Sequence, residues 1–245
     1  MIQNRIVSVI LPAYRKESVI LECITRLIKT LSDDHVVFEI IVVIDGRVDS
    51  TFELISAANF PQVSVLNFQS NRGKGAALKS GVSQARGEII VFFDADLDIH
   101  PASIVKGLEK MKGSTDLALV SGNKMHVDSS IKYPLIRRIY SRSLKIIVGV
   151  MFRVNSSDTQ TGLKIFDSKV LNEVIRKSIS TGYLLDLELM YLIEKRGYMH
   201  SDIAVDIEMG LNSTIKLNHI LEMLRDLAFL RYEHSKIAVL IRKLR

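Results

Sequence analysis

The chain has 245 residues, of which 47% are hydrophobic and 24% charged, so it can bury a sizeable core and favours one large domain with a tail. Its formal net charge of +6 predicts affinity for something anionic: nucleic acid, a lipid headgroup surface or a phosphorylated substrate. The single cysteine, Cys23, excludes an intramolecular disulfide and favours a reducing compartment.

Neither a membrane span nor an export signal is predicted. The longest apolar candidate, residues 146–152, lies between Lys145 and Arg153 and is far shorter than the ~18 residues that a spanning helix needs. The first residues lack the charged start and the cleavage site of a signal peptide. We therefore expect a cytoplasmic protein that lies on a membrane only peripherally.

Apolar β-branched runs alternate with stretches of helical period through the first half of the chain. Strands are predicted at residues 7–11, 38–44, 63–66 and 89–93. Crossover helices are predicted between them, at 17–31, 50–58 and 73–85. This order predicts an α/β fold with a mainly parallel sheet flanked by helices.

The second half is less regular. It predicts a helix at about 134–148, a polar loop through Asp158, a strand at 163–166 and helices up to Arg196. We expect a catalytic domain over residues 1–212, with halves at about 1–122 and 123–212, and a basic amphipathic helical tail over 213–245. A stripe of apolar residues in this tail suits either membrane docking or packing onto protein: Leu217, Leu221, Leu224 and Ala228.

Three short segments directly follow predicted strands. They are Pro12-Ala13-Tyr14, Asp45-Gly46 and Asp94-Ala95-Asp96. In open α/β sheets, ligands bind beyond the carboxyl ends of the strands. These three segments are therefore expected to border one ligand crevice.

Asp94 and Asp96 come directly after a buried strand and are separated by one residue. The strand's end can present both carboxylates to a ligand while Ala95 points away. Two carboxylates suit Mg²⁺ or Mn²⁺, which bind through few protein oxygens and through substrate phosphates. A solvated acidic turn is the alternative, and the position after a buried strand favours the metal site.

A glycine-rich segment, Asn71-Arg72-Gly73-Lys74-Gly75, opens a predicted helix. Glycines allow close backbone approach, and the amides of a helix N-terminus beside a basic residue favour an anion. The segment lacks the spacing of an ATPase phosphate loop. A phosphate site and a plain helix start are equally compatible with it.

Taken in order, these motifs resemble the inverting nucleotide-sugar transferases of GT-A fold. Within that family they are similar to the polyprenol-phosphate sugar synthases, typified by dolichyl-phosphate mannose and glucose synthases. The resemblance covers nearly the whole chain and rests on Val-Ile-Leu-Pro-Ala-Tyr with Glu17, Ile-Ile-Val-Val-Ile-Asp-Gly, Asn-Arg-Gly-Lys-Gly-Ala-Ala, Asp-Ala-Asp-Leu-Asp, Asp158-Thr-Gln-Thr-Gly-Leu-Lys-Ile-Phe and Leu185-Asp-Leu-Glu.

The resemblance implies a role for residues in both halves. Asp94 and Asp96 would hold the metal, and Asp98 would either bind it too or cap the following helix. The implied nucleotide-sugar site consists of Pro12, Ala13, Tyr14, Glu17, Asp45, Lys74, Asp94 and Lys216. A purely structural role is the alternative for three of these residues. Pro12 and Tyr14 would form a turn at the end of a strand, and Glu17 would be an exposed acid in the first turn of a helix.

Two residues depart from the family pattern. The family usually has paired acids where this chain has Ile44-Asp45, and it has a small residue near the position of Arg47. Recognition of the base is therefore left open.

A basic amphipathic stretch at residues 132–153 has six basic residues and no acid. It suits an anionic membrane surface, although a solvated basic face is the common alternative. The family's acceptor-phosphate site resembles Lys124 with Arg137 and Ser141. Asp158 is the expected acid near the reacting centre, or else it orders its loop.

We predict a metal-dependent hexose transfer from a nucleotide sugar to a polyprenyl or dolichyl phosphate at the cytosolic membrane face. UDP-glucose is the first donor expected and GDP-mannose the second. One alternative is a soluble transferase that uses Asp158 as a base toward a hydroxyl acceptor. The other is a non-catalytic nucleotide-binding module. Nucleic acid is not an expected partner, whereas a homo-oligomer or a separate membrane partner is compatible with the sequence.

Overall fold

The computed structural model describes residues 5–112, 116–124, 149, 151–152, 161–207 and 217–235. The chain divides into two compact units. The first comprises Met1–Ile131 and Ser156–Met209, and the second comprises Lys132–Asn155 and Gly210–Arg245. The strands described below all belong to the first unit.

The first half of the chain forms the elements that its hydrophobic pattern predicts. All four predicted strands and all three predicted crossover helices are confirmed, and their bounds are β1 (Val7–Ala13), α1 (Ile20–Asp33), β2 (Phe38–Ile44), α2 (Thr51–Ala58), β3 (Val63–Asn67), α3 (Lys74–Gln84) and β4 (Ile89–Phe93). Helix α1 starts three residues later than predicted, because residues 14–19 form a loop with Arg15 at a φ of 54°.

The second half adds strands that the pattern did not predict. Strand β6 and the helices before Arg196 are confirmed, whereas β5 and β7 were missed; the bounds are α4 (Ala102–Lys112), β5 (Leu117–Asn123), β6 (Leu163–Asp167), α6 (Ser168–Ile175), α7 (Leu185–Lys195) and β7 (Met199–Ala204). The helix predicted at 134–148 and the polar loop through Asp158 lie outside the described residues. In the second unit, α8 (Leu217–Glu233) falls within the predicted helical tail.

The strands form one sheet in the order β3-β2-β1-β4-β6-β5-β7. Neighbouring strands are parallel from β3 to β4 and again between β5 and β7. Strand β6 is antiparallel to both of its neighbours, β4 and β5. The expected mainly parallel sheet flanked by helices is therefore confirmed, with one antiparallel strand in the second half.

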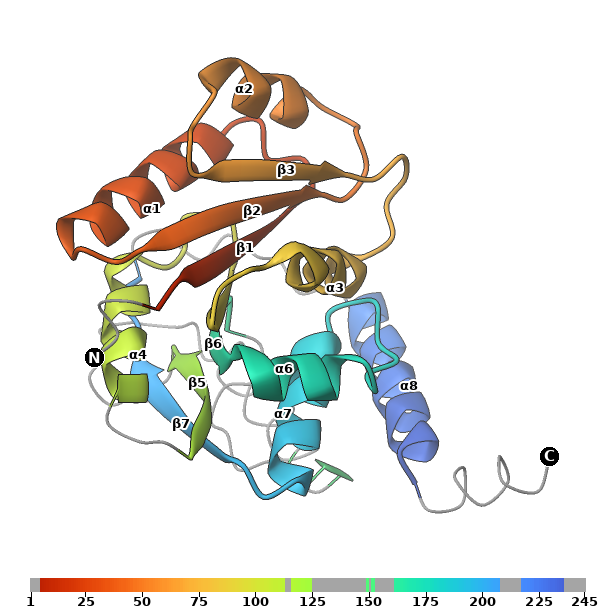
Figure 1. Cartoon of the computed structure of the whole chain (residues 1–245). Helices are drawn as coiled ribbons and strands as arrows, with labels where there is room; N and C mark the ends of the chain where they lie inside the picture. Colours follow the sequence, from red (N-terminus) through yellow and green to blue (C-terminus); the bar gives the residue numbers. More distant parts are fainter. Residues whose placement is uncertain are drawn as a thin grey trace. The chain divides into compact units, whose positions relative to one another are not determined.

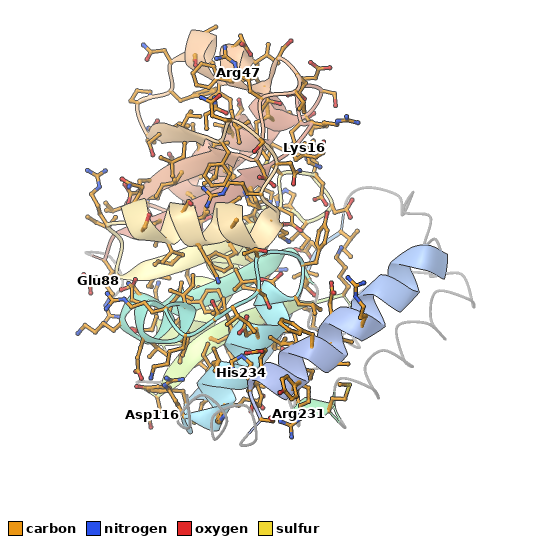
Figure 2. The ribbon with its side chains drawn as sticks, turned by 90° about the vertical axis from the view of Figure 1, so that its right-hand side faces the viewer. Lys16, Arg47, Glu88, Asp116, Arg231 and His234 are labelled. Atoms are coloured by element: carbon orange, nitrogen blue, oxygen red, sulfur yellow. The ribbon has the colours of Figure 1, made fainter. Side chains whose placement is uncertain are left out.

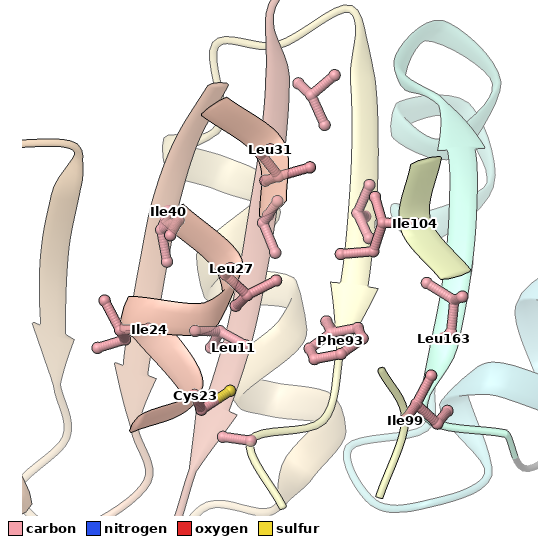
Figure 3. Close-up of a cluster of buried hydrophobic side chains, with 14 of the residues drawn as sticks. Leu11, Cys23, Ile24, Leu27, Leu31, Ile40, Phe93, Ile99, Ile104 and Leu163 are labelled. Atoms are coloured by element: carbon pink, nitrogen blue, oxygen red, sulfur yellow. The ribbon is translucent and has the colours of Figure 1, made fainter. Parts of the chain in front are cut away.

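The helices α1 and α4 cover one face of the sheet, and α3, α6 and α7 cover the other (Figure 1). The buried stripe of α1 includes Ile24, Leu27 and Leu31, whose spacing of three and four residues places them on one helical face. They pack against strand residues such as Leu11 and Ile40 (Figure 3). Burial of apolar side chains such as these is the main stabilising term of the fold.

Cys23 belongs to this core and lies on α1 (Figure 3). Burial raises the pKa of its thiol to about 12. A thiol that stays protonated at neutral pH is a poor nucleophile, so Cys23 is a packing residue.

The sheet has two chemically different ends. Lys16, which follows β1, and Glu88, which precedes β4, lie at opposite sides of the ribbon (Figure 2). The carboxyl ends of β1, β2 and β4 are adjacent, because these strands neighbour one another in parallel. Within the described ranges, no helix has the length and apolar character needed to cross a bilayer.

Candidate active site at the carboxyl edge of the sheet

Asp94 and Asp96 leave β4 as the sequence predicts. Both are partly exposed, whereas Ala95 between them is buried with 1% of its surface exposed. The Asp94 backbone N–H donates to the Gly162 carbonyl at 2.9 Å. A Cβ on Gly162 would lie 2.5 Å from Asp94 Oδ2, so only glycine fits beside this carboxylate. The Thr-Gly of the motif before β6 therefore fixes the first of the two acids.

Lys74, the first residue of α3, lies beside the same carboxylate. Its Nζ is 2.6 Å from Asp94 Oδ1 and 3.8 Å from Asp186 Oδ2. The Lys74 side chain is 17% exposed and that of Asp186 is 7% exposed. The structure thus joins Lys74, predicted near the donor phosphates, to Asp94 and adds Asp186 on α7.

The pKa values of this cluster reflect how tightly its charges are packed. Burial, together with the neighbouring Asp94 carboxylate, raises the pKa of Asp96 above its ordinary value. Burial acts to lower the pKa of Lys74, but the Asp94 and Asp186 carboxylates outweigh it and raise that pKa. The site therefore keeps Lys74 charged and favours a further cation beside Asp96.

The donor set of Asp94 and Asp96 fits Mg²⁺ or Mn²⁺. The Asp94 carboxylate lies close enough to disfavour the charged form of Asp96 and so contributes to its raised pKa, and a hard divalent cation relieves this repulsion. Among the described residues, no three His, Cys, Asp or Glu side chains form a group able to hold a metal ion. One or two carboxylates plus substrate phosphate oxygens are the usual ligands of Mg²⁺ in nucleotide sites.

Asp98 lies next to a residue of the predicted acceptor site. Its Oδ2 is 3.6 Å from Lys124 Nζ, at the end of β5. The first residue of α4, Ala102, donates its backbone N–H to His100 Nδ1 at 3.0 Å. His100 therefore accepts a hydrogen bond from the N-terminus of α4, which is the capping role that the sequence left open for Asp98. The assignment of Asp98 as a metal ligand stays a prediction.

Asp45 is 4% exposed and organises the glycine-rich loop. Its two carboxylate oxygens accept the backbone N–H groups of Arg72 at 2.6 Å and Gly73 at 2.9 Å. Its own N–H donates to the Ala13 carbonyl at 2.8 Å, which ties β1 to β2 at the edge. Asp45 thus holds the loop before α3 at the carboxyl ends of β1 and β2, while a direct contact with the nucleotide stays a prediction.

Glu17 joins the loops that follow β1 and β2. Its Oε2 accepts the Ser50 N–H at 3.0 Å, and its own N–H donates to Asp49 Oδ2 at 3.1 Å. Thr51 Oγ1 in turn accepts the Lys16 N–H at 3.2 Å. Glu17 is therefore a loop residue. The alternative of an exposed acid in the first turn of α1 is wrong, because α1 begins at Ile20.

Other predicted residues border these loops. Pro12 and Ala13 end β1, and Tyr14, which follows them, is 39% exposed. Ile44 is buried in the core at the end of β2. Arg47, the second departure from the family pattern, stacks over Phe52 and pairs with Glu53 on α2. Ile44 is thus part of the hydrophobic core, and the Arg47 side chain contacts α2.

The glycines at the start of α3 permit a close backbone approach, as predicted, and the approaching chain is the loop before α7. A Cβ on Gly75 would lie 2.7 Å from the Thr181 carbonyl carbon. The Ala76 N–H donates to the Thr181 carbonyl at 2.9 Å. Gly73, at a φ of 95°, is equally close to this carbonyl. The N-terminus of α3 is thus partly occupied by protein backbone.

Two buried acids of α7 have different tasks. Both Glu188 oxygens accept backbone N–H groups at 2.8 Å, from Ile179 and from Ser180. Asp186 faces Lys74 instead. Their spacing of two residues places them on different faces of α7, so only one of them faces Lys74. Sequence reasoning assigned Asp186 no role, although its motif was recognised.

Four predicted site residues, namely Asp158, Arg137, Ser141 and Lys216, lie outside the described residues. Their roles stay predictions.

Comparison with known proteins identifies the family. The model of "Glycosyl transferase family 2" matches residues 8–175. A dolichyl-phosphate beta-glucosyltransferase of Dictyostelium discoideum is 27% identical over 248 residues, which cover 95% of this chain and 76% of the relative. A dolichyl-phosphate beta-glucosyltransferase of Trichomonas vaginalis, ALG5D, is 27% identical over 233 residues, which cover 90% of this chain and 71% of the relative.

Solved structures share the fold. Glucosyl-3-phosphoglycerate synthase of Mycobacterium tuberculosis superposes with a TM-score of 0.67 at 22% identity, covering 92% of this chain and 78% of that one. A complex of that enzyme with Mn²⁺, UDP-glucose and phosphoglyceric acid gives a TM-score of 0.67 at 19% identity, with the same coverage. The GT-A fold that the sequence resemblance implied is confirmed, and the chain belongs to glycosyl transferase family 2.

Proposed function

We propose that this chain transfers a hexose from a nucleoside-diphosphate sugar, UDP-glucose in the first instance, to a polyprenyl phosphate. The observation that carries the proposal is the placement of Asp94, Asp96 and Lys74 together at the carboxyl edge of the sheet. The named relatives act on dolichyl phosphate, which supports a lipid phosphate as acceptor. GDP-mannose is the second donor.

The donor's diphosphate would lie against Lys74 and the acidic pair. When bound by Asp94 and Asp96, Mg²⁺ or Mn²⁺ supplies positive charge that offsets the charge developing on the leaving diphosphate. The Lys74 ammonium adds a fixed positive charge at the same place, and Asp94 and Asp186 keep it protonated. The solved Mn²⁺ complexes of the structural relative support a divalent metal here.

A phosphate acceptor sets the demands on the rest of the site. It is anionic near neutral pH, so its oxygen attacks the anomeric carbon without a strong general base. Lys124 and Arg137 would hold it by charge, with Ser141 as a hydrogen-bonding partner. Positioning then suffices for one displacement that inverts the anomeric centre.

Matched acceptors test this function. Full-length protein is incubated with UDP-[¹⁴C]glucose, Mn²⁺ and one of three acceptors: a polyprenyl phosphate, the polyprenol of equal chain length, or 3-phosphoglycerate. We expect label in the organic phase only with the polyprenyl phosphate. Labelling of the polyprenol would show a hydroxyl acceptor and a need for a base such as Asp158. Labelling of 3-phosphoglycerate alone would exclude the lipid.

A lipid acceptor also implies contact with a membrane. We infer a peripheral position on the cytosolic face, supported by the basic stretch at 132–153 and by the cations at the end of the tail. Flotation with liposomes containing anionic lipid tests the tail in the full chain. Replacing Arg242, Lys243 and Arg245 by Glu is expected to reduce flotation, and unchanged flotation would exclude docking through these cations.

A further inference from the structure

Asp186 carries a buried acceptor atom that the described part of the chain leaves unused. The residue is 5% exposed in the first turn of α7, and no described residue donates a hydrogen bond to its Oδ1. A buried carboxylate oxygen without a donor costs free energy, and such atoms are rare in folded proteins. An atom of this kind beside an active site indicates a ligand that supplies the missing donor.

Glu188 shows what a purely structural acid in the same helix looks like. It is fully buried, and both of its oxygens accept backbone N–H groups of the loop before α7. Glu188 therefore already supplies the carboxylate that binds the backbone of that loop. Asp186 is not required for the same purpose.

Lys74 does not satisfy Asp186 either. Its Nζ lies 3.8 Å from Asp186 Oδ2, which exceeds hydrogen-bonding distance, and 2.6 Å from Asp94 Oδ1. The ammonium thus donates to Asp94 and balances the charge of Asp186 at longer range. Asp186 therefore lies close to Lys74 and the acidic pair, and its Oδ1 is still able to accept a hydrogen bond.

The chemistry of the missing donor follows from its surroundings. The disubstituted diphosphate of a nucleotide sugar has no proton to give near neutral pH and would be repelled by a carboxylate, whereas a sugar hydroxyl donates readily to one. In a nucleoside-diphosphate hexose the hexose is bonded directly to the diphosphate, which would lie at Lys74 and Asp94. We propose that Asp186 Oδ1 accepts a hydrogen bond from a hydroxyl of the donor hexose, an inference that rests on the proposed function.

Binding measurements separate this role from a merely structural one. Calorimetric titrations with Mn²⁺ compare UDP-glucose with UDP, and GDP-mannose with GDP, on the wild type, on Asp186→Asn and on Asp186→Ala. One of the two nucleotide sugars is expected to bind to the wild type. For that nucleotide sugar, we expect Asp186→Ala to reduce the affinity about tenfold, and to leave the affinity for the corresponding nucleoside diphosphate unchanged within about twofold. Glu194→Gln, near the other end of α7, is the matched control and should change neither.

The outcomes that overturn the inference are distinct. Equal losses for the sugar nucleotide and the free nucleoside diphosphate would mean that Asp186 only positions Lys74. An unchanged affinity for both would exclude any contact. If the wild type binds none of the four nucleotides, the proposed function itself fails, and the inference fails with it.

Deoxy donors provide a test that does not depend on the folding of a variant. Monodeoxy analogues of the nucleotide sugar that binds each lack one hydroxyl of the hexose. One of these analogues should bind to the wild type about tenfold more weakly than the parent nucleotide sugar. For Asp186→Ala, that analogue and the parent donor should bind alike, because the contact is already absent. A wild type that tolerates removal of every hydroxyl would overturn the inference.

Discussion

Lys74 Nζ lies 2.6 Å from Asp94 Oδ1, so the first residue of α3 is paired with the first residue after β4. The same ammonium lies 3.8 Å from Asp186. One cation therefore holds together acids from two parts of the chain that are 92 residues apart in sequence, since 186 minus 94 is 92.

Lys74→Met should destabilise the protein. It leaves two carboxylates near each other without their cation, and we expect a loss of about 1–3 kcal/mol, because the partial exposure of Asp94 allows water to screen part of the repulsion. Urea unfolding measures it. Lys29→Met, which removes an exposed helical pair with Asp33, should leave the midpoint unchanged. A Lys74→Met protein as stable as the wild type would contradict this role.

Gly75→Ala should disturb the contact between α3 and the loop before α7. The new Cβ would meet Thr181 and Gly182 backbone atoms at 2.7–2.8 Å, and backbone cannot move aside cheaply. We expect a loss of about 1–3 kcal/mol and a weaker affinity for the nucleotide sugar. Gly182→Ala is the control, because its Cβ would meet nothing within 4 Å. Similar melting temperatures for the two variants would refute the close approach.

Glu39 links β2 to the residues before β4 at the other end of the sheet. It accepts hydrogen bonds from the Ser8 hydroxyl at 2.7 Å and from the Arg86 N–H at 2.8 Å. Burial acts to raise the pKa of Glu39, but these bonds and the Arg86 guanidinium outweigh it and lower that pKa. The carboxylate therefore adds stability above its unfolded pKa and loses it as the pH falls through the folded pKa.

Glu39→Gln should accordingly cost about 2 kcal/mol at pH 7. The difference from the wild type should shrink below about pH 4, where the unfolded carboxyl is protonated. Unfolding free energies measured between pH 7 and pH 3 check this. Glu53→Gln removes the exposed partner of Arg47 and serves as the control. A difference between Glu39→Gln and the wild type that is constant with pH would show that the charge is not involved.

Lys124→Ala should affect the acceptor more than the donor. Lys124 directly follows β5 and lies 3.6 Å from Asp98, and the family resemblance implies that it binds the acceptor phosphate. We expect KM for the polyprenyl phosphate to rise about tenfold, because a charge-assisted contact is lost, while the affinity for UDP stays the same. Lys110→Ala, in the last turn of α4, is the control. Weaker UDP binding in Lys124→Ala would place this lysine on the donor side.

The first half of the fold was predictable because its signals are local. Apolar β-branched runs such as residues 40–44 are fully buried, as expected of a strand covered on both faces, and the crossover helices between them have a clear helical period. The position of Asp94 and Asp96 followed from the same reasoning, since polar residues directly after a buried parallel strand lie at the ligand edge.

The missed features depend on contacts between distant residues. Strand β7 contains His200, Ser201 and Asp202, which give it little apolar signal; it forms because β5 pairs with it. Asp45 accepts hydrogen bonds from the backbone N–H groups of Arg72 and Gly73, which are distant in sequence. The role of Asp186 likewise depends on its proximity to Lys74. Spacing along the chain indicated only that Asp186 and Glu188 lie on different faces of a helix.

The most direct test of the central claim is the metal-dependent transfer of labelled hexose to a polyprenyl phosphate, with the wild type and Asp96→Asn side by side. Radiolabelled UDP-glucose and GDP-mannose are supplied with Mn²⁺ or with a chelator. We predict label in the lipid from one donor, loss of that label with the chelator, and a decrease of at least about a hundredfold in Asp96→Asn. Full transfer by Asp96→Asn, or no transfer to the lipid by the wild type from either donor, would contradict the claim.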